Sequence, residues 1–254
     1  MSFMVNSQDF AVVFVILTLF VATFSFTASN EGCYEYSTVG VSISFDDIKN
    51  IDDWKTMMPL LDEYDVKATF YIDNYDHLDE DEIDFLLELQ SAGHEIGAHG
   101  MSHQDYGIHL ENSGTDMTYW LEEVEPEVRM MENDGFVITS FAYPRGVKSP
   151  SIDDLLLENF TALRGVHGYF KQTEPWLAEC SDRAVYNAHT LAQDADNYGK
   201  IKYNMKSLSD DNQAMLFYGH GIGEGEKDVT LETLEDLFMH AQKHDLDWIT
   251  ISEI

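Results

Sequence analysis

Two histidines four residues apart, His99 and His103, have the residue type and the spacing for metal chemistry. Neutral imidazole is the commonest metal ligand among protein side chains. Gly97 and Gly100 indicate that the backbone bends here, so we expect the pair in a loop or a single turn at the end of a strand. Two histidines and one carboxylate would leave coordination positions open, as a catalytic zinc ion requires.

A carboxylate for such a site is available from Asp46 and Asp47, which follow the β-rich residues 39–45. Neighbouring side chains at a strand end point in opposite directions unless the chain turns, so Asp47 is expected to face a metal ion and Asp46 a reacting water. The alternative is that Asp47 only caps the helix that follows it. With His99 and His103, one aspartate completes a three-ligand site for zinc or a similar divalent ion.

Two further polar stretches also stand where a predicted strand ends. Tyr143-Pro144-Arg145-Gly146 closes residues 136–143, and His220 follows residues 214–218. In parallel α/β folds the carboxyl ends of the strands gather on one face, and functional sites lie there. We therefore expect these stretches to meet the aspartates and the histidine pair.

The elements that must position these residues alternate between strand-like and helix-like patterns. Strands are predicted at residues 39–45, 67–72, 94–98, 136–143, 162–166, 184–190, 214–218 and 248–251, and helices at 48–64, 79–90, 117–133, 151–159 and 230–244. The alternation predicts a mostly parallel sheet, either open or closed into a barrel. A length of 254 residues fits one α/β domain.

The N-terminal residues predict export from the cytoplasm. Residues 10–26 are apolar and uncharged, and small or polar residues follow, which predicts a signal peptide over residues 1–29. A short segment, residues 30–38, would then precede the catalytic domain at 39–254. No Lys or Arg precedes the apolar run, which departs from the usual signal-peptide pattern. The run just reaches the minimum length of a membrane span, so an uncleaved N-terminal anchor at residues 10–26 is the alternative. Both alternatives place the domain outside the cytoplasm, either secreted or membrane-anchored.

The formal net charge of −33 restricts the partners of the protein. It argues against nucleic acids and anionic membrane surfaces, because their phosphates would be repelled. It favours a neutral or weakly charged substrate, although an excess of carboxylates also simply keeps a surface solvated. In an oxidising compartment Cys33 and Cys180 either pair or remain free.

Four motifs resemble, in the same order, those of the polysaccharide deacetylase family (carbohydrate esterase family 4). They are Ser44-Phe45-Asp46-Asp47, His99-Gly100-Met101-Ser102-His103, Phe141-Ala142-Tyr143-Pro144-Arg145-Gly146 and Leu216-Phe217-Tyr218-Gly219-His220-Gly221-Ile222. The resemblance covers roughly residues 39–254. It implies a distorted (β/α) barrel of about seven strands, an Asp-His-His metal site, and hydrolysis of acetyl groups, usually from the nitrogen of N-acetylated sugars.

The resemblance also implies a role for each matching residue. The metal ligands, for a divalent ion that is expected to be Zn²⁺, are Asp47, His99 and His103. Asp46 resembles the general base and His220 the general acid. The metal would polarise the acetyl carbonyl and lower the pKa of bound water. The backbone N–H of Arg145, with Tyr143 in support, is expected to stabilise the oxyanion.

Among the departures of the sequence from the family pattern, two concern the partners of Asp46 and His220. The family commonly has an arginine directly after the phenylalanine of the third motif, where it orients the catalytic aspartate, and this chain has Ala142. Arg145 or Arg164 would have to reach Asp46 instead. The motif that supports the acid histidine has no clear counterpart, and the candidates are Asp194 and Asp196.

The sequence therefore predicts a secreted, metal-dependent polysaccharide deacetylase. Its expected partner is an acetylated polysaccharide or oligosaccharide of chitin, peptidoglycan or poly-N-acetylglucosamine type. One alternative keeps the fold and hydrolyses O-acetyl esters, as on xylan, or small amides. Another is a non-catalytic carbohydrate-binding protein, which the intact Asp46 and His220 argue against, because binding alone needs neither a base nor an acid.

Overall fold

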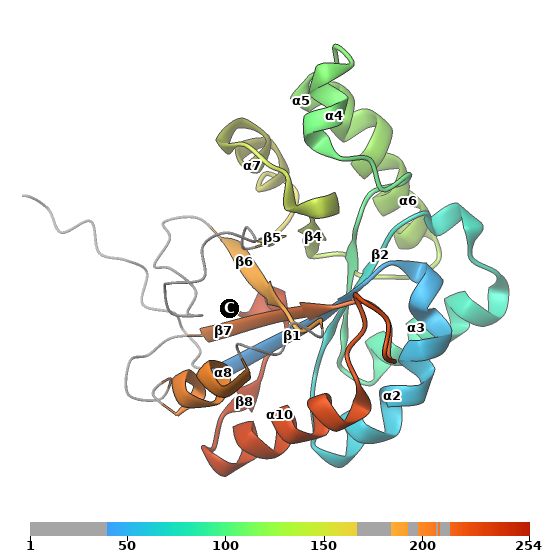
Figure 1. The fold of residues 1–254 in the computed structure, drawn as a ribbon. Helices are drawn as coiled ribbons and strands as arrows, with labels where there is room; N and C mark the ends of the chain where they lie inside the picture. Colours follow the sequence, from blue (N-terminus) through green and yellow to red (C-terminus); the bar gives the residue numbers. More distant parts are fainter. Residues whose placement is uncertain (1–39, 167–183, 193–197, 207, 209–213) are drawn as a thin grey trace, which may run out of the picture. The chain divides into compact units, whose positions relative to one another are not determined.

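The computed structural model describes residues 40–166, 184–192, 198–206, 208 and 214–254. These residues form a single α/β domain in which helices surround a parallel barrel (Figure 1). The predicted signal peptide or anchor, residues 30–38, both cysteines, Asp194 and Asp196 lie outside the described residues. Within the described ranges, no helix is both long and apolar enough to span a membrane.

Seven strands close the barrel, all of them parallel. In spatial order they are β1 (Gly40–Asp46), β2 (Thr69–Ile72), β3 (Glu95–Ala98), β4 (Ser140–Ala142), β5 (Ala162–Val166), β6 (Val185–Thr190) and β7 (Ala214–Gly219). β7 pairs with β1 along its whole length and so closes the ring. The predicted (β/α) barrel of about seven strands is confirmed.

The barrel is distorted at the seam beside β1. The last residues of β1 pair with β2, whereas its first residues, Gly40 and Val41, pair with an eighth strand, β8 (Asp247–Trp248). The chain after β8 lies at the amino end of the barrel, where the Ser252 N–H donates to Glu95 Oε2. The predicted final strand is shorter than expected, because Thr250 begins a 3₁₀ turn.

The helices lie outside the barrel. They are α2 (Ile51–Glu63), α3 (Glu80–Ser91), α4 (Tyr106–Glu111), α5 (Asp116–Tyr119), α6 (Glu125–Asn133), α7 (Pro150–Leu156), α8 (Tyr198–Met205) and α10 (Leu231–Lys243). A π-helical turn, Trp120–Val124, joins α5 to α6, so the helix predicted over residues 117–133 is continuous in space but not uniform. Pro126 stands in the first turn of α6, directly after the π-helical turn.

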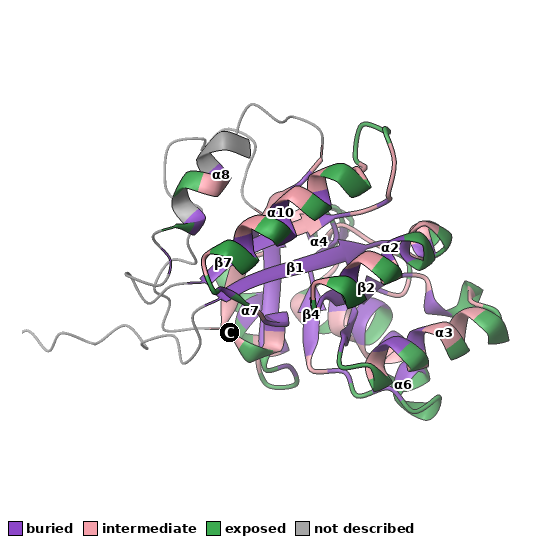
Figure 2. Cartoon of the chain, turned by 90° about the horizontal axis from the view of Figure 1, so that it is seen from below, coloured by how far each residue is buried: buried purple, intermediate pink, exposed green. Residues whose placement is uncertain are grey.

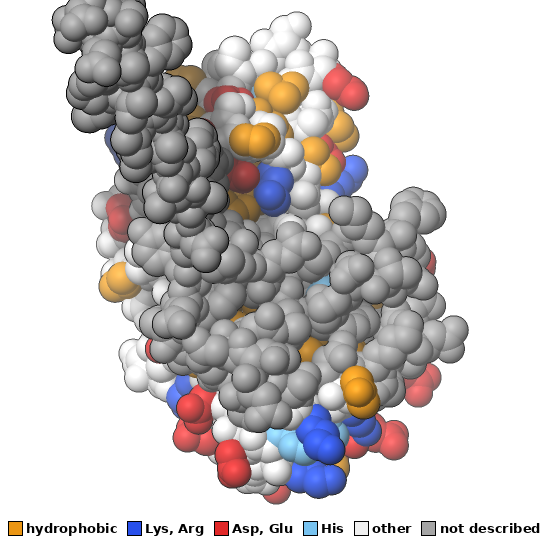
Figure 3. All heavy atoms as spheres, turned by 90° about the vertical axis from the view of Figure 1, so that its left-hand side faces the viewer, with side chains coloured by type: hydrophobic (Ala, Val, Ile, Leu, Met, Phe, Trp, Pro, Cys, Tyr) orange, Lys and Arg blue, Asp and Glu red, His pale blue; other side chains and the backbone are white. Residues whose placement is uncertain are grey.

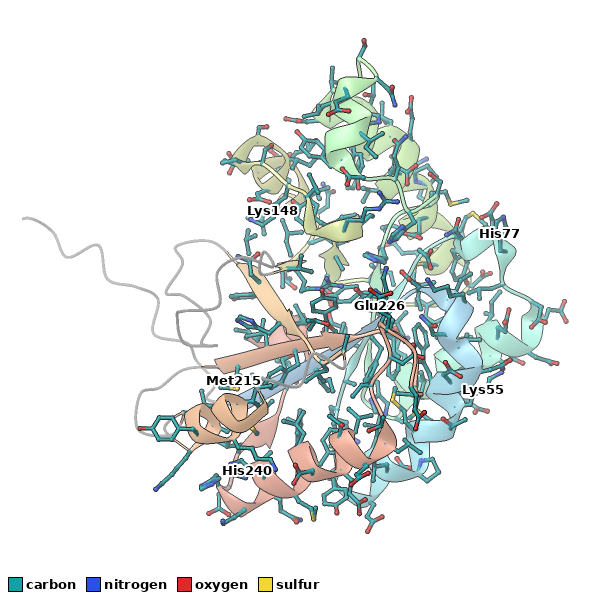
Figure 4. The ribbon with its side chains drawn as sticks, in the orientation of Figure 1. Lys55, His77, Lys148, Met215, Glu226 and His240 are labelled. Carbon is teal, nitrogen blue, oxygen red and sulfur yellow. The ribbon has the colours of Figure 1, made fainter. Side chains whose placement is uncertain are left out.

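α8 packs against α10 at the side of the barrel. His240, labelled in Figure 4, bonds the Lys202 carbonyl oxygen through Nε2 at 2.8 Å, and Lys202 forms an ion pair with Asp236. Figure 3 shows histidine side chains next to Lys or Arg side chains at the lower edge of the face in view. The hydrogen bond and the ion pair at Lys202 connect α8 to α10.

Apolar side chains occupy two separate layers. Outward-facing strand residues such as Ile43 and Phe45 pack beneath the helices, and Figure 2 shows the strands buried while the helices expose their outer faces. The barrel interior is lined by small residues, among them Ala142 and Ala162, together with Tyr71. The small residues leave room inside the barrel for a large polar side chain, which is Arg164.

Candidate functional site

Three strand ends bring the predicted site residues together. Asp47 follows β1, His99 follows β3 and His220 follows β7, whose loop also carries Glu226 (Figure 4). Asp47 Oδ1 lies 3.7 Å from His99 Nε2 and 3.5 Å from His103 Nε2. Asp47 Oδ2 lies 4.0 Å from His220 Nε2. The carboxyl end of the barrel therefore gathers four of the residues singled out in the sequence.

Asp47 reaches this position because the backbone turns at the end of β1. Its φ of 72° and ψ of 118° are unusual for a residue other than glycine. Its N–H donates to the Tyr71 carbonyl oxygen at 3.2 Å, which ties the turn to β2. The turn lets Asp46 and Asp47 approach the same His99 Nε2, at 3.9 and 3.7 Å. The Asp47 side chain makes no N-cap hydrogen bond, so helix capping does not explain its place.

The residues present fit a divalent metal ion. One ligand atom from each of Asp47, His99 and His103 lies within 4.8 Å of the other two. Zinc bonds of about 2.0–2.1 Å in a tetrahedral arrangement would place ligand atoms about 3.4 Å apart. Asp47 Oδ1 is buried and has no hydrogen-bond partner among the described residues. His99 Nδ1 donates to the Ala142 carbonyl oxygen at 2.8 Å, which leaves Nε2 unprotonated and directed at the site.

The electrostatics of the site favour the protonation states that bind metal. Burial would raise the pKa of Asp47, but His99, the Lys49 ammonium 2.9 Å from Oδ2 and the other site histidines outweigh it and lower the pKa. Burial lowers the pKa of His99, an effect that Asp46 opposes and Arg164 reinforces. An ionised aspartate and a neutral imidazole are the forms that coordinate a metal ion.

Asp46, at the end of β1, is held by an arginine from β5, a strand that does not pair with β1. Arg164 Nη2 lies 2.5 Å from both carboxylate oxygens of Asp46, and the two residues are only 1% and 3% exposed. The guanidinium stacks over the rings of Tyr71 and Tyr218, at 5.0 and 5.2 Å from their centroids. Arg164 on β5 pairs directly with Ala142 on β4. Arg164, which pairs with Ala142 across β4 and β5, thus makes the contact with Asp46 that was expected of an arginine at position 142.

His220 is fixed through its backbone. The Trp54 indole N–H donates to the His220 carbonyl oxygen at 3.0 Å, so this buried tryptophan of α2 both fills the core and holds the loop. Burial lowers the pKa of His220, while Asp46 and Asp47 partly oppose the shift. His220 Nδ1 is buried without a partner among the described residues.

Tyr143 and Arg145 form the turn after β4. The Tyr143 hydroxyl donates to Asp153 Oδ1 of α7 at 2.7 Å, so the tyrosine side chain anchors the turn rather than facing the aspartates. Arg145 has an exposed side chain and a φ of 58° within the turn Pro144–Gly146. The oxyanion role of the Arg145 N–H stays a prediction.

Three carboxylates near the metal ligands were not found from the sequence. Asp73 follows β2 as Asp46 ends β1, so the strand-end argument could have identified it. Glu123 and Glu127 lie in the π-helical turn and α6, where a spacing of four residues predicts only a solvated helix face. Both glutamates are instead buried, and burial raises the pKa of Glu127 well above its usual value.

A family model described as polysaccharide deacetylase matches residues 36–159. No curated protein sequence gives a significant match. Similar solved structures include a chitin deacetylase from the fungal pathogen Colletotrichum lindemuthianum, with a TM-score of 0.56 and 12% identity, covering 85% of this chain and 88% of that chain. A family 4 acetyl xylan esterase from Clostridium thermocellum in complex with cobalt has a TM-score of 0.54 and 17% identity, covering 84% and 88%. A family 4 pseudoenzyme from Bacillus anthracis has a TM-score of 0.51 and 13% identity, covering 86% and 66%.

At these identities the structural likeness shows the fold alone. The family model adds the match in sequence, and its span includes Asp46, Asp47, His99 and His103. The match thus includes all three residues of the candidate metal site. This chain belongs to the polysaccharide deacetylase family, carbohydrate esterase family 4.

Proposed function

We propose that this protein is a metal-dependent hydrolase that removes N-acetyl groups from an acetylated glycan. The proposal rests mainly on one observation: three side chains that could hold a metal ion lie beside both a buried carboxylate, Asp46, and an imidazole, His220. Metal binding alone would need neither of them. Amide hydrolysis needs a base for the attacking water and an acid for the departing amine.

Each residue has a distinct part in this reaction. Asp47, His99 and His103 would hold the ion, for which we propose zinc, and the bound ion would supply carbonyl polarisation and an acidified water. Asp46 would accept the water proton on a carboxylate oxygen. Arg164 contacts both oxygens of Asp46 and so keeps the carboxylate in one orientation.

Two other loops would act on the leaving group and the oxyanion: the loop after β7, with His220, and the turn after β4, with Arg145. His220 Nε2 would donate a proton to the amine nitrogen, and the lowered pKa of His220 makes its protonated form a stronger donor. The Arg145 N–H would stabilise the oxyanion, with the turn fixed by the bond from Tyr143 to Asp153. Both assignments place neutralising groups where charge develops during hydrolysis.

The proposed partner is a neutral or weakly charged acetylated polysaccharide or oligosaccharide. The net charge of −33 disfavours polyanionic substrates. A chitin deacetylase and an acetyl xylan esterase both share the fold, so N-acetyl and O-acetyl groups are the chemistries to compare. An extracytoplasmic location, secreted or anchored by residues 10–26, would place the protein among such polymers.

The test is acetate release by the purified, zinc-loaded protein from N-acetylglucosamine oligomers. We expect release that is abolished by a chelator and by Asp46→Asn, but retained in Asp52→Asn, which removes one exposed carboxylate from the outer face of α2. Release only from acetylated xylan would assign the protein to O-acetyl ester hydrolysis. No acetate from any acetylated sugar, with metal shown to be bound, would refute the enzymatic function and leave a carbohydrate-binding protein.

A further inference from the structure

The loop that carries both histidine ligands is bonded to two carboxylates through its backbone. Glu127, which is fully buried, accepts hydrogen bonds on Oε2 from the N–H groups of His99, at 3.1 Å, and Gly100, at 2.7 Å. The carbonyl-type oxygen of a carboxyl group can accept both bonds whether the group is ionised or protonated. Glu127 therefore fixes the backbone at the first histidine.

Glu123 holds the same loop on both sides of the second histidine. Its Oε2 accepts from the N–H groups of Ser102, at 3.0 Å, and Gln104, at 3.3 Å. The Ser102 hydroxyl donates to Glu123 Oε1. The backbone carbonyl oxygen of Glu123 accepts the Met101 N–H at 2.7 Å. Both backbone neighbours of His103 are thus bonded to one side chain.

The third metal ligand has an equivalent support. Asp73 Oδ1 accepts the N–H of Ile48 at 2.8 Å, directly after Asp47. Asp47 has the positive φ noted above, a conformation that persists only when its surroundings maintain it. The bond from Ile48 to Asp73 is one of the contacts that maintain it.

The helix geometry explains how two glutamates reach one loop. Glu123 belongs to the π-helical turn and Glu127 to α6, and π-helical turns are often found at functional sites. Gly100 has a φ of 95°, and a Cβ there would lie 3.3 Å from Glu123 Oε2. A glycine at this position lets the loop lie close against the two carboxylates.

We propose that Asp73, Glu123 and Glu127 are positioning residues that set the three metal ligands in place before the metal binds. The inference rests on the metal centre of the proposed function. A loop ordered in advance loses less conformational entropy when it binds, so its affinity is higher. Removing outer partners of metal ligands typically weakens metal binding about 10–100-fold.

The test compares zinc dissociation constants, measured by competition with a chromophoric chelator, in matched variants. Glu123→Met and Glu127→Met remove the acceptors, and we expect affinity about 10–100-fold below wild type. Glu127→Gln keeps an oxygen for both N–H groups and should stay within about threefold of wild type. Glu95→Met is the control, because Glu95 is also buried and accepts three hydrogen bonds, but at the amino end of the barrel. It should bind zinc as wild type does.

Two further readouts keep the proposal falsifiable if a methionine variant does not fold. In the metal-free wild-type protein, the amide hydrogens of Gly100, Ser102 and Gln104 should exchange slowly, because their acceptors are present without metal. The visible spectrum of the cobalt-loaded protein should change in Asp73→Leu, which removes the acceptor beside Asp47, and stay unchanged in Glu95→Met.

The outcomes separate this inference from the proposed function. If wild-type protein does not bind zinc, the metal centre is wrong and both proposals fail. If wild type binds zinc and the glutamate-to-methionine variants bind it within threefold, the positioning role alone is overturned. Equal losses in Glu127→Gln and Glu127→Met would also overturn it, since they would indicate attraction by charge. Fast exchange of the three loop amides in the metal-free protein would contradict ordering before binding.

Discussion

Replacing Arg164 by methionine should destabilise the protein and its catalysis together. Arg164 is the buried cation that contacts both oxygens of Asp46. Removing one partner of a buried ion pair leaves the other charge uncompensated, which costs about 3–5 kcal/mol of unfolding free energy. Each cation–π contact of the guanidinium, with Tyr71 and Tyr218, adds about 0.5–2 kcal/mol. Methionine retains part of the buried volume but neither of these interactions, so we expect a net loss of at least about 4 kcal/mol.

A double-mutant cycle isolates the ion pair from the packing. Asp46→Asn combined with Arg164→Met removes both charges, so the double variant should be about 2–3 kcal/mol more stable than the sum of the single changes predicts. The assay is urea unfolding of metal-free protein at pH 7. Arg129→Met is the matched control, since the exposed Arg129–Glu125 pair on α6 should contribute less than about 1 kcal/mol.

Catalysis gives a second measure of the same pair. Arg164→Met should lower kcat/KM about 10²–10⁴-fold, the range of a lost general base, and the double variant should be no slower than Asp46→Asn alone. Because Ala142 pairs with Arg164 across β4 and β5, Ala142→Arg combined with Arg164→Ala should recover part of the lost rate.

Two results would refute this reasoning. A loss of less than about 1 kcal/mol in Arg164→Met, with additive single effects, would show that the ion pair contributes no more than an exposed one. An unchanged kcat/KM in a well-folded Arg164→Met protein would show that Asp46 needs no partner.

Three other predictions concern the barrel and the metal. His94 accepts the Ala68 N–H as a neutral ring, and burial lowers its pKa to about 4. The unfolded chain therefore binds a proton first as the pH falls from about 6.5, so wild type should lose about 3 kcal/mol by pH 4 relative to His94→Gln, measured by urea unfolding. Gly97→Ala would place a Cβ 2.5 Å from Tyr71 Cε1, so it should cost about 1–3 kcal/mol, seen as a lower Tm and a lower kcat/KM. Metal present at 100 times its Kd should stabilise the protein by about 2.7 kcal/mol, so a chelator should lower the Tm of wild type but not of Asp47→Ala.

Each of these three has a result that contradicts it. Parallel pH profiles of wild type and His94→Gln would mean that His94 does not titrate between the folded and unfolded states. An unchanged Tm in Gly97→Ala would mean that the Tyr71 ring moves aside at no cost. An equal effect of chelator on wild type and Asp47→Ala would place any bound metal elsewhere.

Local patterns in the sequence were enough to predict the barrel and the central residues of the site. The alternation of strands and helices predicts parallel strands, and parallel strands place their carboxyl ends on one face. That argument suffices to bring Asp47, His99 and His220 together, because each follows its strand directly. The glycines around His99 correctly predicted a bend instead of a helix.

The remaining features depend on contacts that no local pattern encodes. Arg164 supports Asp46 only because β4 and β5 pair in a register that places it opposite Ala142, and neither strand specifies that register alone. Glu123 and Glu127 have the spacing of an exposed helix face, and only the packing of the π-helical turn against the His99 loop buries them.

The position of β1 in the ring has a consequence for how the protein folds. β1 lies near the start of the described chain, whereas its partner β7 lies near the end. The hydrogen bond from the Ser44 hydroxyl to the Phe217 carbonyl oxygen joins residues 173 positions apart in the sequence. Contacts of such long range slow folding, because the entropy of closing the loop is lost before the contact forms. Until β7 arrives, β1 and β6 present open edges on which other chains can pair. The step that brings His220 to Asp47 is therefore also the step that protects the folding chain from aggregation.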